Sequence, residues 1–89
     1  MREPYLEVTF RHGLPLAGYY YLPRKTGQKT CRTRRIEPGL VVDFGRGDEP
    51  IGIEITAPTK VTLSAFNEVL DQLGQPPIDE RDFAPLRAA

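Results

Sequence analysis

Two short segments near the middle of the chain place apolar residues at every second position. The segment Leu40–Phe44 reads LVVDF, and Ile51–Ile55 reads IGIEI. Side chains of a strand point alternately to the two faces of a sheet, so each segment has one apolar side. Antiparallel pairing aligns these sides and sets Leu40 opposite Ile55, Val42 opposite Ile53, and Phe44 opposite Ile51. The middle of the chain is therefore predicted to be a β-hairpin with one buried face.

The residues around this hairpin carry turn signals. Glu37-Pro38-Gly39 precedes the first segment, and a proline followed by glycine suits the central positions of a tight turn. A further strand is therefore expected before the turn, at about residues 31–36. Residues 45–50 are rich in glycine, aspartate and proline, and we expect them to form an exposed, mobile loop.

The N-terminal part of the chain predicts a second hairpin. Tyr5–Phe10 alternates between apolar and polar residues, and Gly18–Leu22 is rich in aromatic residues that favour strands. Residues 11–16 are expected to form the loop between them. A register with Val8 opposite Tyr20 and Leu6 opposite Leu22 gathers the apolar residues on one face. The opposite face would then be rich in tyrosine, from Tyr5, Tyr19 and Tyr21.

The hydrophobic period changes after Thr62. Apolar residues recur at spacings of three and four, at Leu63, Phe66, Val69, Leu70 and Leu73. This spacing predicts a helix over about 63–73 that packs on the sheet. Pro76 and Pro77 prevent the helix from continuing. The tail 75–89 is expected to add a short helical turn around Asp79–Phe83, anchored by Ile78, Phe83 and Leu86.

These elements predict an α+β fold, in which a small antiparallel β-meander of about five strands is covered by a C-terminal helix. A chain of 89 residues has room for one core, so we expect a single domain over 1–89, with the sheet at about 5–58. A domain of this size buries a small share of its surface, so self-association would be a natural source of further stability.

The same central segments resemble a known family. Residues 37–44 read EPGLVVDF and residues 51–58 read IGIEITAP. This pattern resembles the small bacterial proteins grouped as domain of unknown function 2283, over residues 37–58. In that family a proline-glycine turn leads to a strand ending in aspartate and then to a Gly-Ile-Glu-Ile strand. The resemblance implies a bacterial protein with a compact β-meander, and it carries no catalytic residue with it.

Composition restricts the cellular setting. Lys plus Arg and Asp plus Glu both number 12, so no overall charge draws the chain to nucleic acid or to an anionic membrane. Charged residues interrupt the first 20 positions, and Cys31 has no second cysteine with which to form a disulfide. We therefore expect a cytoplasmic protein without a membrane segment.

No residue pattern matches a catalytic or cofactor motif, so we expect a non-enzymatic protein without a cofactor. Asp43 and Glu54 should be diagonal neighbours on the face opposite the apolar residues, which makes them weak candidates for a metal site. A metal-dependent enzyme that uses these two carboxylates is one alternative. His12 is the only histidine and is expected in a loop, while Cys31 is expected to be a small core residue.

Residues 24–35 carry six basic residues and no acidic one. With the nearby tyrosines, Arg32, Arg34 and Arg35 are candidates for binding phosphates, so a nucleic-acid-associated protein is the first alternative, ahead of the metal-dependent enzyme. Residues 37–54 hold five acidic residues and one basic residue, and these acids provide a competing explanation, because they would offset the basic segment.

The leading hypothesis is a protein-interaction module that forms a homodimer. A second apolar face of a sheet must be covered by the helix or by another molecule. If the helix covers the aliphatic face, the tyrosines become the contact surface, with Tyr5, Tyr19, Tyr20 and Tyr21 as candidates.

Overall fold

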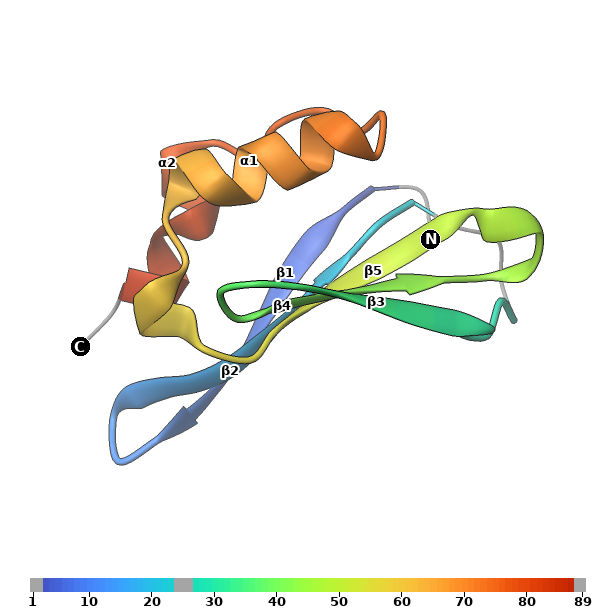
Figure 1. Cartoon of the computed structure of the whole chain (residues 1–89). Helices are drawn as coiled ribbons and strands as arrows, with labels where there is room; N and C mark the ends of the chain where they lie inside the picture. The colour runs from blue at the N-terminus through green and yellow to red at the C-terminus, as the bar shows by residue number, and fades with distance from the viewer. Residues whose placement is uncertain (1–2, 24–26, 88–89) are drawn as a thin grey trace.

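The computed structural model describes residues 3–23 and 27–87. The strands are β1 (Tyr5–Arg11), β2 (Leu14–Tyr21), β3 (Arg32–Ile36), β4 (Leu40–Phe44) and β5 (Pro50–Ile55). The helices are α1 (Leu63–Gln72) and α2 (Glu80–Phe83), and 3₁₀ turns occupy Arg46–Asp48, Pro58–Lys60 and Ala84–Arg87. Figure 1 shows two layers, with the helices on one face of the sheet. The predicted α+β fold with a five-stranded antiparallel sheet is confirmed.

The strands are arranged in the order β1-β2-β5-β4-β3. The last three form a meander along the chain, and the β1–β2 hairpin joins it through β5, because β2 lies beside β5 rather than beside β3. All neighbouring strands are antiparallel. The two edges of the sheet are therefore β1 and β3.

The central hairpin agrees with the predicted register over most of its length. Leu40 lies opposite Ile55 and Val42 opposite Ile53. An irregularity after Asp43 sets Phe44 opposite Pro50 instead of Ile51, although all six predicted apolar residues are buried. The loop between the strands forms the 3₁₀ turn, which is closed where the Gly45 amide donates to the Glu49 carbonyl at 2.8 Å.

The first hairpin is tighter than the sequence suggested. The loop expected at 11–16 is wrong, because the chain reverses at His12 and Gly13, whose φ angles are +53° and +77°. Two consecutive positive φ angles are typical of the two-residue turns that suit the twist of a hairpin. β2 therefore starts early, and its register differs from the prediction by two residues, with Leu6 opposite Tyr20. A shift of two keeps every side chain on its predicted face.

The core lies between the sheet and α1. Phe66 on α1 is buried, and its ring centre lies 5.3 Å from that of Tyr20 and 5.4 Å from that of Phe83. Thr62 caps the helix by accepting from the Ala65 amide at 3.0 Å. The predicted anchors of the tail are confirmed, since Ile78, Phe83 and Leu86 are all buried.

Asn67 attaches the tail to α1. Its side-chain amide donates to the Ile78 carbonyl at 3.1 Å, and its oxygen accepts from the Ile78 amide at 2.8 Å. One side chain therefore satisfies both backbone groups of a buried residue in an irregular segment.

Among the described residues, no helix is long and apolar enough to span a bilayer.

Candidate interaction surface

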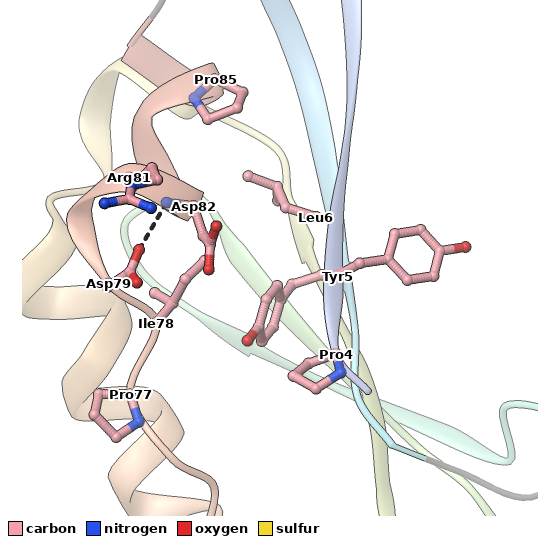
Figure 2. A pocket seen from close by; sticks show the side chains of 10 residues that line it. Pro4, Tyr5, Leu6, Pro77, Ile78, Asp79, Arg81, Asp82 and Pro85 are labelled. Carbon is pink, nitrogen blue, oxygen red and sulfur yellow. Dashed lines mark hydrogen bonds between the residues drawn. The ribbon is translucent and has the colours of Figure 1, made fainter. Parts of the chain in front are cut away.

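The helices leave one face of the sheet uncovered (Figure 1). We call this uncovered side of the sheet the tyrosine face. Strand pairing places on it the side chains of six residues from four strands, which are Tyr5, Glu7, Tyr19, Tyr21, Asp43 and Glu54. The tyrosine-rich second face predicted from alternation is confirmed, because it holds all three predicted tyrosines. Figure 2 shows Tyr5 and Leu6 pointing to opposite sides of β1, with Leu6 toward α2.

The three rings of the tyrosine face form one aromatic cluster. Tyr5 stacks on Tyr21, with ring centres 4.6 Å apart and planes 19° apart. Tyr19 meets Tyr21 edge-on, at 4.7 Å and 64°. Both arrangements are favourable for aromatic pairs, so each ring restrains its neighbour.

Carboxylates of the same face hold two of the hydroxyl groups. Tyr19 donates to Asp43 Oδ2 at 2.7 Å, and Tyr21 donates to Glu7 Oε1 at 3.1 Å. The first bond joins β2 to β4 across the intervening strand β5. Charge-assisted hydrogen bonds therefore fix two rings of the aromatic cluster, those of Tyr19 and Tyr21.

Gly52 on β5 makes this crossing possible. Gly52 lies opposite Tyr21 on one side and Asp43 on the other. A Cβ atom at Gly52 would overlap the ring and hydroxyl of Tyr19. Tyr19 therefore lies over the glycine, in the space that a side chain would fill, as aromatic residues do beside glycines in other sheets.

Tyr20 does not belong to the tyrosine face, and its selection as an interface candidate is corrected. It lies on the opposite side of β2, where it is 5% exposed and packs against Phe66. Burial raises the pKa of its hydroxyl, and the nearby carboxylates of Asp82 and Asp79 raise it further. Tyr20 is thus part of the core, because its position in the alternation matches that of Leu22.

Asp43 and Glu54 lie on the same face, as predicted. Asp43 is opposite Gly52, and Glu54 is two residues further along β5, so the two carboxylates are diagonal neighbours. Tyr19 lies opposite Glu54 and donates to Asp43. In the parts of the chain that are described, no group of three or more His, Cys, Asp or Glu side chains is placed to hold a metal ion.

The three candidate arginines do not share a surface. Arg32 and Arg34 pair with buried residues of β4 and so lie on the core side of β3, whereas Arg35 lies on the tyrosine-face side. Residues 24–26 of the basic segment are outside the described residues. Because side chains alternate along β3, arginines that are adjacent in sequence lie on opposite faces of the sheet.

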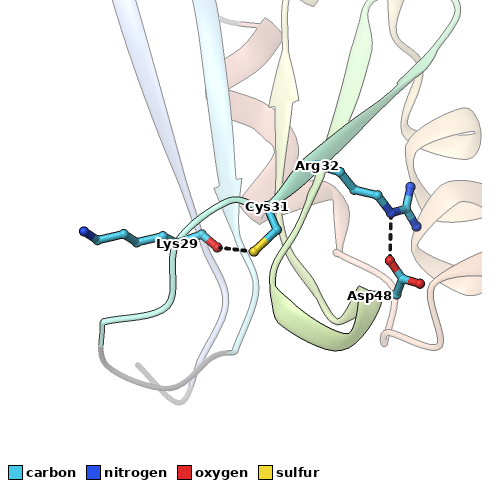
Figure 3. Close-up of polar contacts among 4 residues, drawn as sticks. All are labelled: Lys29, Cys31, Arg32 and Asp48. Carbon is cyan, nitrogen blue, oxygen red and sulfur yellow. Dashed lines mark hydrogen bonds and ion pairs between the residues drawn. The ribbon is translucent and has the colours of Figure 1, made fainter.

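Acidic residues accompany two of these arginines, as the competing explanation of the basic segment predicts. Arg32 forms an ion pair with Asp48 at 2.7 Å (Figure 3). Its guanidinium lies 4.1 Å from the centre of the Phe44 ring. Arg35 lies 3.8 Å from Glu37. Both acids come from the segment 37–54.

His12 and Cys31, the single histidine and the single cysteine of the chain, are both exposed. His12 lies in the turn of the first hairpin, as expected for a loop residue, and it is exposed. Cys31 is exposed, so its expected place in the core is wrong. It comes just before β3, where its amide donates to the Phe44 carbonyl at 2.7 Å. Figure 3 shows its thiol directed toward the Lys29 carbonyl, 3.8 Å away.

Sequence reasoning missed a cavity between the start of β1 and α2. It has a volume of about 480 Å³ and is lined by Pro4, Leu6, Tyr20, Asp79, Arg81 and Asp82, among others. Figure 2 shows that prolines border it on several sides. The side chain of Asp79 accepts from the Asp82 amide at 2.9 Å, so this carboxylate serves as a helix cap.

Comparisons of the chain with protein-family models, curated proteins and solved structures found no match. The resemblance to domain of unknown function 2283 therefore remains an expectation.

Proposed function

We propose that this protein is a non-enzymatic interaction module whose tyrosine face binds an extended, basic segment of another protein. The observation that carries the proposal is the aromatic cluster of Tyr5, Tyr19 and Tyr21, which lies among carboxylates on the face that the helices leave uncovered. We place this activity in the cytoplasm, where the unpaired thiol of Cys31 would stay reduced.

The aromatic cluster supports binding because its side chains are already ordered. Ring contacts and two hydroxyl–carboxylate bonds restrain the tyrosines before any partner arrives. Binding therefore costs little further side-chain entropy. Tyrosine is also enriched among the residues that dominate protein interfaces.

Charge supports a basic partner. The tyrosine face carries Glu7, Asp43 and Glu54, and Arg35 at the β3 edge is a base on the same side. Two copies meeting face to face would bring these carboxylates toward one another. Arginine or lysine side chains would instead be attracted by the acids and by the faces of the rings.

The aromatic rings of the face support an extended partner. Proline-rich segments in the polyproline II conformation dock on aromatic surfaces and lose little entropy when they do so. We therefore name the partner as a segment rich in proline and arginine or lysine. Tyr5, which is 46% exposed, offers the most accessible ring for such contacts.

Fluorescence anisotropy with a labelled peptide of alternating proline and arginine tests this proposal. We expect binding that weakens with added salt and that disappears when glutamate replaces arginine in the peptide. The Tyr5→Ser/Tyr21→Ser variant should raise Kd at least about tenfold, equivalent to about 1.4 kcal/mol. Leu14→Ser/Leu16→Ser is the control, because it removes exposed apolar side chains outside the cluster.

Three results would contradict the proposal. The first is equal affinity for the acidic and the basic peptide. The second is unchanged affinity in the tyrosine variant while circular dichroism shows that it folds. The third is binding of a single-stranded or duplex oligonucleotide at low salt with no binding of the peptide, which would favour the arginines of β3 instead.

A further inference from the structure

The exposed large hydrophobic residues of the described chain all lie on one hairpin. There are four of them, and they are Tyr5 at 46% exposure, Phe10 at 46%, Leu14 at 55% and Leu16 at 52%. Tyr5 and Phe10 belong to β1, and the two leucines belong to β2. Figure 1 shows the turn end of this hairpin extending past the helices. Phe10, Leu14 and Leu16 lie near the turn of the hairpin, and exposed apolar side chains gathered in one region are typical of an interaction site.

The two edges of the sheet differ in their protection. β3 is short and carries three exposed arginines, which discourage pairing with another strand. β1 has seven residues and contains no proline or lysine. The irregularity in the hairpin places the extra residue, Leu16, on β2, so β1 itself remains regular. β1 is thus the edge with backbone groups suited to accept a further strand.

We infer that two copies of the chain join through β1, as antiparallel strands centred on Thr9. The sequence of β1 is self-complementary about this residue. Thr9 would meet its own copy, Val8 would meet Phe10 of the second copy, and Glu7 would meet Arg11. Each dimer would therefore contain two apolar pairs on one face and two ion pairs on the other.

The position of α2 favours this register. The cavity between α2 and β1 is lined by Leu6, Asp79 and Asp82, so the helix lies beside the start of the strand (Figure 2). Centring the pair on Thr9 puts the contact in the second half of β1, beyond the helix. Phe10, which continues the side of β1 occupied by Leu6 and Val8, would then be covered by the second copy.

The inference uses an edge of the sheet, whereas the proposed function uses its uncovered face. A two-fold axis at Thr9, perpendicular to the sheet, would set the two tyrosine faces side by side on one surface. Such a dimer would bind a partner with two basic segments more tightly than a monomer would. Self-association can fail while peptide binding persists, or the reverse, so the two are tested separately.

The sharpest test reverses the charges of Glu7 and Arg11, which flank the two-fold axis. Sedimentation velocity at about 10–100 μM, a range that suits modest affinities, measures the dimer. We expect a dimer for the wild type. Arg11→Glu and Glu7→Arg should each weaken it at least about tenfold, because like charges would meet twice at the interface. An equimolar mixture of these two variants should restore the dimer, since every Glu would again meet an Arg.

Arg35→Glu is the matched control, because it makes the same change of charge at the opposite edge and should leave the dimer intact. Phe10→Ser, which keeps every charge, should also weaken the dimer. A monomeric wild type would overturn the inference. So would Arg11→Glu remaining dimeric, or a mixture of the two charge variants remaining monomeric while each is folded by circular dichroism.

Discussion

Replacing Gly52 with alanine tests whether Tyr19 lies across β5 as described. In most strands a change from glycine to alanine is stabilising, because glycine loses more backbone entropy on folding, and the gain is about 0.5–1 kcal/mol. Here the added Cβ atom would overlap the Tyr19 ring and hydroxyl. Tyr19 would have to leave its position, and it would lose its bond to Asp43 and its contact with Tyr21.

The magnitude follows from these contacts. The hydrogen bond to the Asp43 carboxylate is only partly buried and contributes about 1–1.5 kcal/mol, the upper part of the range for a typical intramolecular hydrogen bond. The edge-on contact with Tyr21 contributes about 0.5–1.5 kcal/mol. After the gain of about 0.5–1 kcal/mol from replacing glycine, Gly52→Ala should lower the free energy of unfolding by about 1 kcal/mol.

Urea unfolding followed by circular dichroism, in a double-mutant cycle, measures this effect. Tyr19→Ala removes the obstructing ring, so Gly52→Ala should be neutral or stabilising in the Tyr19→Ala background. The predicted coupling between the two positions is about 1.5–2 kcal/mol, and the denaturant dependence should stay constant. If Gly52→Ala stabilises the wild type, or costs the same in both backgrounds, Tyr19 does not lie over Gly52.

Two further predictions concern the core side of the sheet. Asn67→Ala should lower the free energy of unfolding by about 1–3 kcal/mol, because it leaves two backbone groups of Ile78 without partners, and hydrogen exchange should accelerate at the Ile78 amide. The raised pKa of Tyr20 means that the folded state holds this proton more tightly than the unfolded state does. Its contribution to stability is therefore present below about pH 10 and is lost as pH rises further; Tyr20→Phe should flatten this alkaline decline in thermal melts, whereas an equal decline in both proteins would contradict it.

Periodicity predicted the faces of the sheet more accurately than its connections. The pairs Leu40–Ile55 and Val42–Ile53 agree with the prediction, because pairing the two segments along most of their length brings their apolar sides onto one face. Tyr5, Tyr19 and Tyr21 fall on one face for the same reason. The predicted register of the first hairpin was wrong by two residues, but the predicted faces are correct, since a shift of two residues leaves each side chain on the same side of the sheet.

The remaining errors involve information that local patterns do not contain. His12 adopts a positive φ angle, which is unusual for a residue other than glycine, so the two-residue turn gave a weak signal. Tyr20 was grouped with its neighbours as an interface residue, although alternation assigns it to the core. The importance of Gly52 depends on Tyr19, which is distant in sequence. Alternation also separates Arg34 from Arg35, so a run of charge in sequence is no guide to a charged surface.

An NMR titration of the isotope-labelled protein with the proline–arginine peptide would locate binding directly. Shift changes that are largest at Glu7, Tyr19, Tyr21 and Glu54, and absent from the outer side of α1, would agree with a partner seated on the uncovered side of the sheet. Changes concentrated on α1, or in the cavity beside α2, would show that the aromatic cluster serves only to stabilise the fold.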